Sequence, residues 1–212
     1  GEFASFLTAA VPSHVLDRVG RTVVEQSLTI SSLARFVADI GRDERPHWFA
    51  FPRETHHYDL FNFLFINFNY TTLLDSFVYL DQVQFDPHPF SQAYRNFQFY
   101  PNPDSNPAFS RNSNTSWSSY VLTETVHPHG NVGVPRSLLF GADSDGEANW
   151  DAQRTWMIAK PFWAQNRVKY SHLFGDTRLF VIFGSSLGAS DGWWWRSIGQ
   201  ALADTRAELV IY

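Results

Sequence analysis

The chain has 212 residues, a net charge of −5 and no cysteine, and these properties bound the kinds of protein it can be. A chain of this length buries roughly 70% of its unfolded surface, so a hydrophobic core forms without disulfides or a structural metal. The lack of cysteine excludes disulfides, thiolate metal sites and a cysteine nucleophile. No apolar run approaches the roughly eighteen residues that a transmembrane helix needs. No dense patch of Lys and Arg occurs, which disfavours nucleic acid as a partner. We therefore expect a cytoplasmic protein with no membrane segment.

The N-terminal part of the sequence has helical periodicity. Apolar residues recur at helical spacing over residues 13–41, which predicts two amphipathic helices that join near Ser27 or Thr29. A charged connection with prolines follows. Residues 1–58 are therefore expected to form a mostly helical portion.

The middle of the sequence changes from an apolar run to an irregular composition. Residues 62–69, NFLFINFN, predict a strand that is covered on both faces, as in a parallel sheet. Residues 71–80 follow with helical spacing. Residues 85–120 are rich in Pro, Asn and Ser and predict a long loop-rich insertion, a length typical of functional loops.

The C-terminal half alternates between strand and helix patterns. Four segments have the apolar runs of strands: 120–130, 137–141, 177–187 and 207–212. Two segments between them have helical spacing: 149–170, interrupted at Pro161, and 189–205. The alternation predicts a single α/β domain over residues 1–212, with a largely parallel sheet flanked by helices. We expect 62–69, 178–184 and 208–212 to be neighbouring strands of that sheet.

Three of the predicted strands end in short polar segments. We call them the first, second and third strand-end segments: NFNYT at 67–71, HPHGN at 127–131 and GSSLGASD at 184–191. In open α/β sheets, ligands bind beyond the carboxyl ends of the strands. If the sheet brings the three segments together, their amides, hydroxyls and imidazoles form a small-molecule site.

The polar residues of these segments also have structural interpretations. Asn69 is as well suited to capping the helix that follows as to binding a ligand. His127 and His129 lie two residues apart and so face one side of a strand, as metal ligands do. No third ligand stands out, so we expect no metal and a structural hydrogen bond for at least one histidine. Helix capping is the preferred interpretation of Ser190 and Asp191.

Two further groups have alternative interpretations. Ser185 and Ser186 either contact a ligand or satisfy backbone groups in a tight turn. Trp193, Trp194 and Trp195 cannot all face a core, because successive helical residues point about 100° apart. Part of the tryptophan surface is therefore expected to be an interface or a lid for the insertion.

Four segments, in this order, resemble the AbiH-type abortive-infection proteins of bacterial phage defence. They are FINFNYTTLLD, VHPHGN, LLFGAD and LFVIFGSSLGASDGWW, and the resemblance extends over residues 60–212. That family is similar to the sirtuin-like proteins, so the resemblance implies a sirtuin-like, Rossmann-like core that binds NAD. It further implies an antiviral defence protein that cleaves NAD to nicotinamide and ADP-ribose as an NAD glycohydrolase-like hydrolase. A homo-oligomer or a partner defence protein is the expected assembly.

The resemblance also implies roles for individual residues by position. His129 matches the sirtuin-like histidine and would take a proton in the reaction, and Asn69 matches the asparagine that orients water or ribose. Five residues would bind the nucleotide: Asn67, Gly130, Gly184, Ser185 and Ser186.

The sequence departs from the family pattern in two respects. Thr71 stands where many sirtuin-like enzymes have Asp. The Gly-Asn-Gly-Phe-Asp phosphate loop usual in the family does not occur, which indicates that residues preceding Gly1 supply it or that the chain is a fragment. Both departures favour the alternative function, a non-catalytic nucleotide-sensing or protein-interaction module of a defence system.

Overall fold

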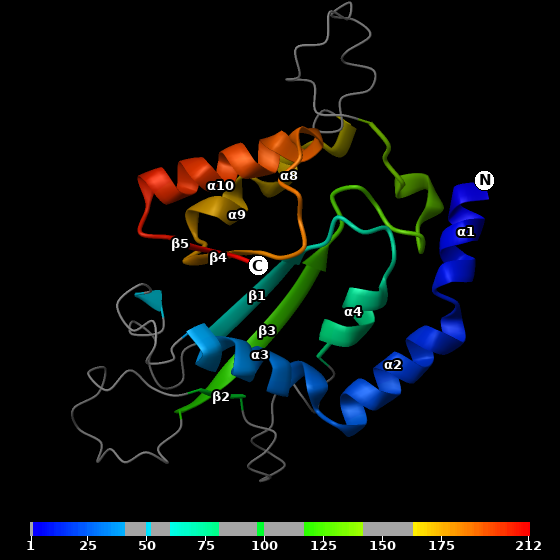
Figure 1. The fold of residues 1–212 in the computed structure, drawn as a ribbon, viewed down its shortest axis with the longest axis horizontal. Helices are drawn as coiled ribbons and strands as arrows, with labels where there is room; N and C mark the ends of the chain where they lie inside the picture. The colour runs from blue at the N-terminus through cyan, green and yellow to red at the C-terminus, as the bar shows by residue number, and fades with distance from the viewer. Residues whose placement is uncertain (1, 41–49, 52–59, 81–96, 100–116, 142–162) are drawn as a thin grey trace, which may run out of the picture. The chain divides into compact units, whose positions relative to one another are not determined.

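A computed structural model describes residues 2–40, 50–51, 60–80, 97–99, 117–141 and 163–212 (Figure 1). The chain divides into two units. Unit 1 consists of residues 1–67 and 71–127, and unit 2 consists of residues 68–70 and 128–212. The division does not test the prediction of a single domain over residues 1–212, which stays a prediction.

Unit 1 begins with three helices. They are α1 (Glu2–Ala10), α2 (Ser13–Glu25) and α3 (Leu28–Ile40). The two helices predicted over residues 13–41 are confirmed as α2 and α3. Their junction includes Ser27, whose φ of 51° lies in the left-handed region. A residue in that conformation cannot continue a right-handed helix, which accounts for the break at the predicted place.

Unit 1 also contains a three-stranded sheet with the order β1-β3-β2. Strand β1 (Leu60–Ile66) is parallel to β3 (Trp117–Val126), with Leu60 opposite Tyr120 and Ile66 opposite Val126. The short strand β2 (Phe97–Phe99) pairs with β3 in the antiparallel direction. Helix α4 (Leu73–Val78) follows β1, close to the helix predicted over residues 71–80.

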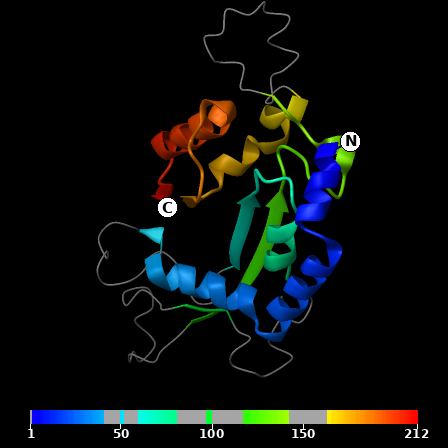
Figure 2. The same ribbon diagram turned by 45° about the vertical axis from the view of Figure 1, so that its right-hand side comes forward.

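Helix α3 lies against β1 and β3 and forms the core of unit 1 with them (Figures 1 and 2). Its Thr29 is fully buried and donates a hydrogen bond from Oγ1 to the carbonyl of Phe77 at the end of α4. Thr123 Oγ1 on β3 donates in the same way to the carbonyl of Val78. The central hydrophobic cluster consists of Ile30, Leu33, Val37, Phe61 and Val121.

Unit 2 contains a second parallel pair of strands. Strand β4 (Leu179–Ile182) and strand β5 (Glu208–Ile211) pair over their whole length and are connected through helix α10 (Gly192–Asp204). The strands predicted over 177–187 and 207–212 and the helix predicted over 189–205 are confirmed as β4, β5 and α10. The other elements are the 3₁₀ helices η4 (Pro135–Ser137) and η5 (Ala189–Asp191) and the helices α8 (Asn166–Tyr170) and α9 (His172–Gly175).

The class of fold is α/β with parallel strand pairs, but the arrangement of the strands differs from the prediction. Strand β1 pairs with β3, whereas β4 pairs with β5. Within the described residues, hydrogen bonds therefore do not join the three predicted strands into one sheet, and the expectation of one sheet is not met there. The sequence patterns indicated buried strands, but apolar runs do not specify which strand pairs with which.

Two strand predictions near the second strand-end segment are corrected. The strand predicted over 120–130 ends at Val126, because Pro128 has no amide proton to donate and Gly130 has a φ of 79°. Residues 137–141 form no strand. The 3₁₀ turn η4 begins at Pro135, which fixes φ at a helical value, and it leads directly into this segment.

Two other predictions fall partly outside the described residues. Of the insertion predicted over 85–120, residues 97–99 belong to β2 and β3 begins at Trp117. Of the helix predicted over 149–170, residues 166–170 form α8, while 142–162 lie outside the described residues.

Candidate functional site

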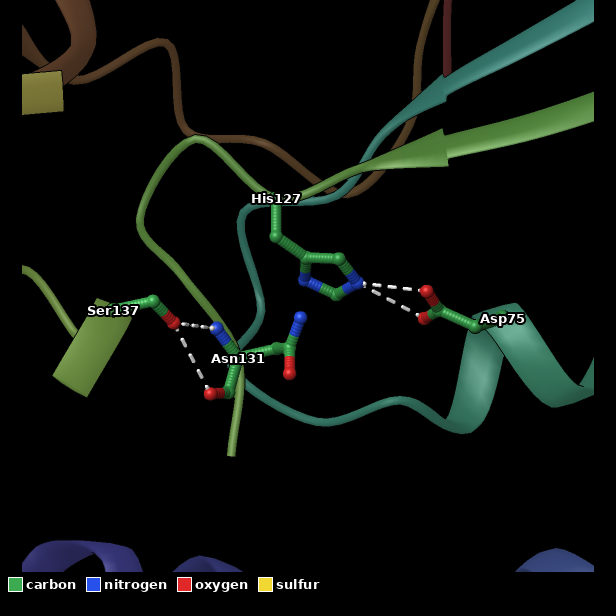
Figure 3. A network of polar contacts seen from close by, with 4 residues as sticks. All are labelled: Asp75, His127, Asn131 and Ser137. Carbon is green, nitrogen blue, oxygen red and sulfur yellow. Dashed lines mark hydrogen bonds and ion pairs between the residues drawn. The ribbon is translucent and has the colours of Figure 1, made fainter. Parts of the chain in front are cut away.

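Residues 128–131 of the second strand-end segment begin the C-terminal part of unit 2 and are held in a tight loop. Gly130 is buried with a φ of 79°, and a Cβ atom there would lie 2.1 Å from the carbonyl oxygen of Ser137. The amide of Leu139 donates to the carbonyl of His129 at 2.9 Å. Ser137 Oγ accepts a hydrogen bond from the amide of Asn131 at 3.0 Å (Figure 3). Glycine is therefore required at position 130 by the close approach of η4.

The imidazole of His129 pairs with the carboxylate of Asp191 at the beginning of α10. Nε2 of His129 lies 2.9 Å from Oδ1 of Asp191, and the two side chains are 7% and 20% exposed. The other carboxylate oxygen, Oδ2, accepts a hydrogen bond from Ser190 Oγ at 3.1 Å. Both carboxylate oxygens thus have partners, so the orientation of the Asp191 side chain is defined.

The pairing of Asp191 corrects the capping interpretation. Asp191 does occupy the N-cap position of α10, but its side chain makes no capping hydrogen bond. An N-cap carboxylate normally accepts from the second or third amide of the helix. Here the carboxylate is directed to His129 instead, a partner 62 residues earlier in the chain (191 − 129). Sequence reasoning missed this role, although the acidic residue stood at the end of the third strand-end segment.

Two aromatic rings of the first strand-end segment lie beside His129. The ring centroids of Phe68 and His129 are 5.3 Å apart, and those of Tyr70 and His129 are 6.4 Å apart. Phe68 also contacts Trp194 and Trp195, with centroids 5.6 and 5.8 Å away. The imidazole is therefore enclosed in an aromatic environment, and His129 as a residue is only 5% exposed.

Tyr70 links the loop to the electrostatics of the site. Its hydroxyl donates to the carbonyl of Leu139 at 3.0 Å, and its own carbonyl accepts from the amide of Val132 at 2.8 Å. Burial, and in second place the negative charge of Asp191, raise the pKa of Tyr70 above its ordinary value. Tyr70 is therefore a neutral hydrogen-bond donor near pH 7, beside the His129–Asp191 pair.

The predicted asparagines lie in different units. Asn69 belongs to unit 2 and is exposed. It does not occupy the N-cap position of α4, which is taken by Thr72. Asn67 belongs to unit 1 and is buried. Its backbone N–H donates to the carbonyl of Val126 at 2.9 Å, which continues the β1–β3 ladder. Asn69 therefore lies in the same unit as His129, whereas the backbone of Asn67 has a structural role.

The predicted Gly-Ser turn lies on the third strand-end segment of unit 2. Gly184 has a φ of 63°, and no other group lies within 4 Å of the place where a Cβ would be. Ser185 Oγ accepts from the amide of Leu187 at 3.2 Å, which is the turn-stabilising role that the sequence left open beside a ligand role. Ser186 is exposed. At its end, the third strand-end segment contacts His129 through the side chain of Asp191. The roles of Gly184, Ser185 and Ser186 in ligand binding stay predictions.

His127 has a different partner from His129. In unit 1, its Nε2 lies 2.9 and 3.0 Å from the two carboxylate oxygens of Asp75 on α4 (Figure 3). The expectation that at least one of the two histidines makes a structural contact is confirmed. Within the residues that the structure describes, no group of three or more His, Cys, Asp or Glu side chains is arranged to hold a metal ion.

Comparison with family models, with curated proteins and with solved structures gave no match to this chain. The AbiH-type and sirtuin-like resemblance therefore remains a sequence-based hypothesis, carried by the motifs alone. Among the helices in the described ranges, none is long and apolar enough to cross a membrane. The functional argument consequently depends on the side chains around His129.

Proposed function

We propose that unit 2 binds NAD or a closely related nucleotide and hydrolyses its nicotinamide–ribose bond as part of an anti-phage abortive-infection response. The observation that carries the proposal is the meeting of all three strand-end segments at one imidazole. His129 comes from the second segment, Phe68 from the first and Asp191 from the third. Ligands of α/β proteins bind at such strand ends, where polar groups from separate segments converge.

In the proposed reaction, His129 acts as the general base. Water attacks C1′ of the ribose while the bond from C1′ to the nicotinamide nitrogen breaks. The bonding electron pair leaves with nicotinamide and neutralises its cationic ring, and the proton of the attacking water passes to His129. A base with a pKa near the working pH typically contributes 10²- to 10⁴-fold to the rate, and histidine is the usual residue for this role.

The other predicted residues would bind and orient the nucleotide. Asn69 is exposed in the same unit and would orient water or ribose. Gly184 leaves open space beside the backbone, which allows a phosphate or ribose to approach closely. Ser185 and Ser186 follow directly and would supply hydroxyl and amide groups to the same part of the ligand.

The proposal is tested by incubating the full-length protein with NAD and separating nicotinamide and ADP-ribose by chromatography. His129→Ala is expected to abolish most turnover per folded molecule, because it removes the proton acceptor. His127→Ala is the matched control, because His127 pairs with Asp75 in the other unit. Thermal unfolding of both variants separates loss of folding from loss of chemistry. Equal losses of activity in the two variants, in proportion to their losses of stability, would refute a catalytic role for His129.

A non-catalytic nucleotide-sensing module is the second candidate. The observation that favours it is the burial of His129, whose residue is only 5% exposed and whose Nε2 is already paired. A structural histidine with these properties would order the loop without touching a substrate. Calorimetric titration with NAD distinguishes the candidates: binding without release of nicotinamide supports the module, and binding with release supports the hydrolase.

A further inference from the structure

The sequence assigned Asp191 to helix capping, and the family resemblance assigned it no role, yet it is the ionic partner of the proposed base. We infer that Asp191 is the positioning residue of His129: its carboxylate holds the Nε2 proton and so fixes the tautomer and the orientation of the imidazole. This inference rests on the proposed function for its catalytic meaning. Its physical content, the control of one imidazole by one carboxylate, can be measured without any substrate.

The geometry of the pair supports a fixed tautomer. A neutral imidazole carries its proton on one nitrogen and a lone pair on the other, and a carboxylate can only accept. With Nε2 2.9 Å from Oδ1 of Asp191, the tautomer protonated at Nε2 is the one that forms a hydrogen bond. Nδ1 then carries the lone pair that general base catalysis requires.

The backbone around Asp191 is itself held in place. The amide of Asp191 donates to the carbonyl of Gly188 at 3.2 Å, closing η5. The indole Nε1 of Trp195 donates to the same carbonyl at 3.1 Å, so a side chain of α10 stabilises the turn that precedes the helix. Ser190 Oγ donates to the carboxylate oxygen that does not face His129. Supporting contacts of this kind are what hold a catalytic side chain in its productive geometry.

The chain also contains a matched pair for comparison. His127 and Asp75 have the same chemistry, with Nε2 2.9 Å from Oδ1, but they belong to unit 1. A substitution of Asp75 alters the partner of His127 and leaves the partner of His129 unchanged. The two histidines, only two residues apart in the sequence, are therefore reporters for two separate carboxylates.

The test is ¹⁵N NMR of the histidine side chains in the full-length protein, in Asp191→Asn and in Asp75→Asn. His129→Gln and His127→Gln assign the two signals. In Asp191→Asn, the tautomer populations of His129 are expected to shift away from the form protonated at Nε2. His127 should be unchanged. Asp75→Asn should show the reverse pattern. An unaltered His129 signal in Asp191→Asn would overturn the inference.

Kinetics adds a second readout. With NAD, Asp191→Asn is expected to lower kcat by about 10²-fold or more and to leave KM nearly unchanged. The reason is that the wrong tautomer of His129 slows the chemical step without weakening substrate binding. An active wild type whose kcat is unchanged by Asp191→Asn would also overturn the inference. A wild type without NAD turnover, in which His129 still responds to Asp191→Asn, would refute the hydrolase proposal and keep Asp191 as the residue that sets the state of His129.

Discussion

Gly130→Ala is expected to be strongly destabilising, and the structure allows its magnitude to be worked out. Gly130 has a φ of 79°, and forcing an L-residue into the left-handed region costs roughly 1–2 kcal/mol. The new Cβ would also lie 2.1 Å from the oxygen and 2.3 Å from the carbon of the Ser137 carbonyl. Because these atoms are backbone, η4 must move, and overpacking of this kind costs about 1–3 kcal/mol. The expected loss in the free energy of unfolding is therefore about 2–5 kcal/mol.

Two other glycines of unit 2 allow the cost of the left-handed backbone to be measured separately from the cost of the steric overlap. Gly184 has a φ of 63° but open space at the Cβ position, so Gly184→Ala has only the conformational cost, about 1 kcal/mol. Gly199 lies inside α10 with nothing within 4 Å of a Cβ. Gly199→Ala should therefore gain roughly 0.5–1 kcal/mol, since alanine is the better helix former.

Urea unfolding of the full-length protein, followed by circular dichroism, measures all three variants. The expected order of stability is Gly199→Ala, wild type, Gly184→Ala and finally Gly130→Ala. A shift of 1 kcal/mol corresponds to roughly 2–4 °C in Tm for a chain of this size, so the order is also resolvable by thermal unfolding. A Gly130→Ala protein as stable as Gly184→Ala would show that Ser137 does not approach the loop as described, and the reasoning would fail.

The remaining predictions concern one buried hydroxyl and one phenol. Thr29→Val is expected to destabilise unit 1 by about 1–3 kcal/mol, because the carbonyl of Phe77 loses its donor, whereas Thr29→Ser keeps the hydroxyl and should cost less in the same denaturation assay. Burial, with a smaller contribution from Asp191, raises the pKa of Tyr70 above its ordinary 10.0. The folded protein therefore holds the phenolic proton more tightly than the unfolded chain, and the stability that this contributes is present below about pH 10 and lost as the pH rises through the raised pKa. Tyr70→Phe should accordingly lose less stability than the wild type between about pH 9 and pH 11. If the free energy of unfolding fell equally steeply with pH in both proteins, the raised pKa of Tyr70 would be contradicted.

The elements that sequence reasoning predicted well are those with a strong local pattern. Residues 13–41 carry two amphipathic stripes, and of the two residues expected near their junction, Ser27 and Thr29, Ser27 has the left-handed φ. The segment from β4 to β5 likewise has an apolar run, a helical pattern and a second run in immediate succession. Local periodicity is sufficient in such cases because burial of one face decides the conformation.

The elements that it predicted poorly depend on partners far along the chain. Residues 137–141 have the apolar composition of a strand, but no strand among the described residues pairs with them, and the turn that begins at Pro135 leads into them. Asp191 was interpreted from its position before a helix, which is correct for the backbone. Its side chain pairs with His129 instead, and nothing in the local sequence around either residue records that contact.

For the candidate site, the sequence singled out His129 and Gly130 as a proton acceptor and a nucleotide-binding residue, and both roles stay predictions. The structure gives His129 a carboxylate partner and Gly130 a positive φ beside the Ser137 carbonyl. The sequence did not indicate that His127 and His129 would face separate carboxylates, because two residues on a regular strand share a face. The strand ends at Val126, before either histidine, so the alternation rule does not apply to them.

The three residues from Phe68 to Tyr70 have a consequence for any attempt to divide the protein. They belong to unit 2, although the chain before and after them belongs to unit 1. A fragment expressed from Pro128 onward would lack the ring that contacts His129 and both hydrogen bonds that Tyr70 makes with the loop after it. Unit 2 therefore cannot complete its fold from its own continuous stretch of chain. During synthesis, residues 68–70 can form their contacts in unit 2 only after residues 128–141 have emerged. Closing so long a loop has an entropic cost that slows folding. A border drawn between residues 127 and 128 would therefore separate residues 68–70 from the rest of unit 2.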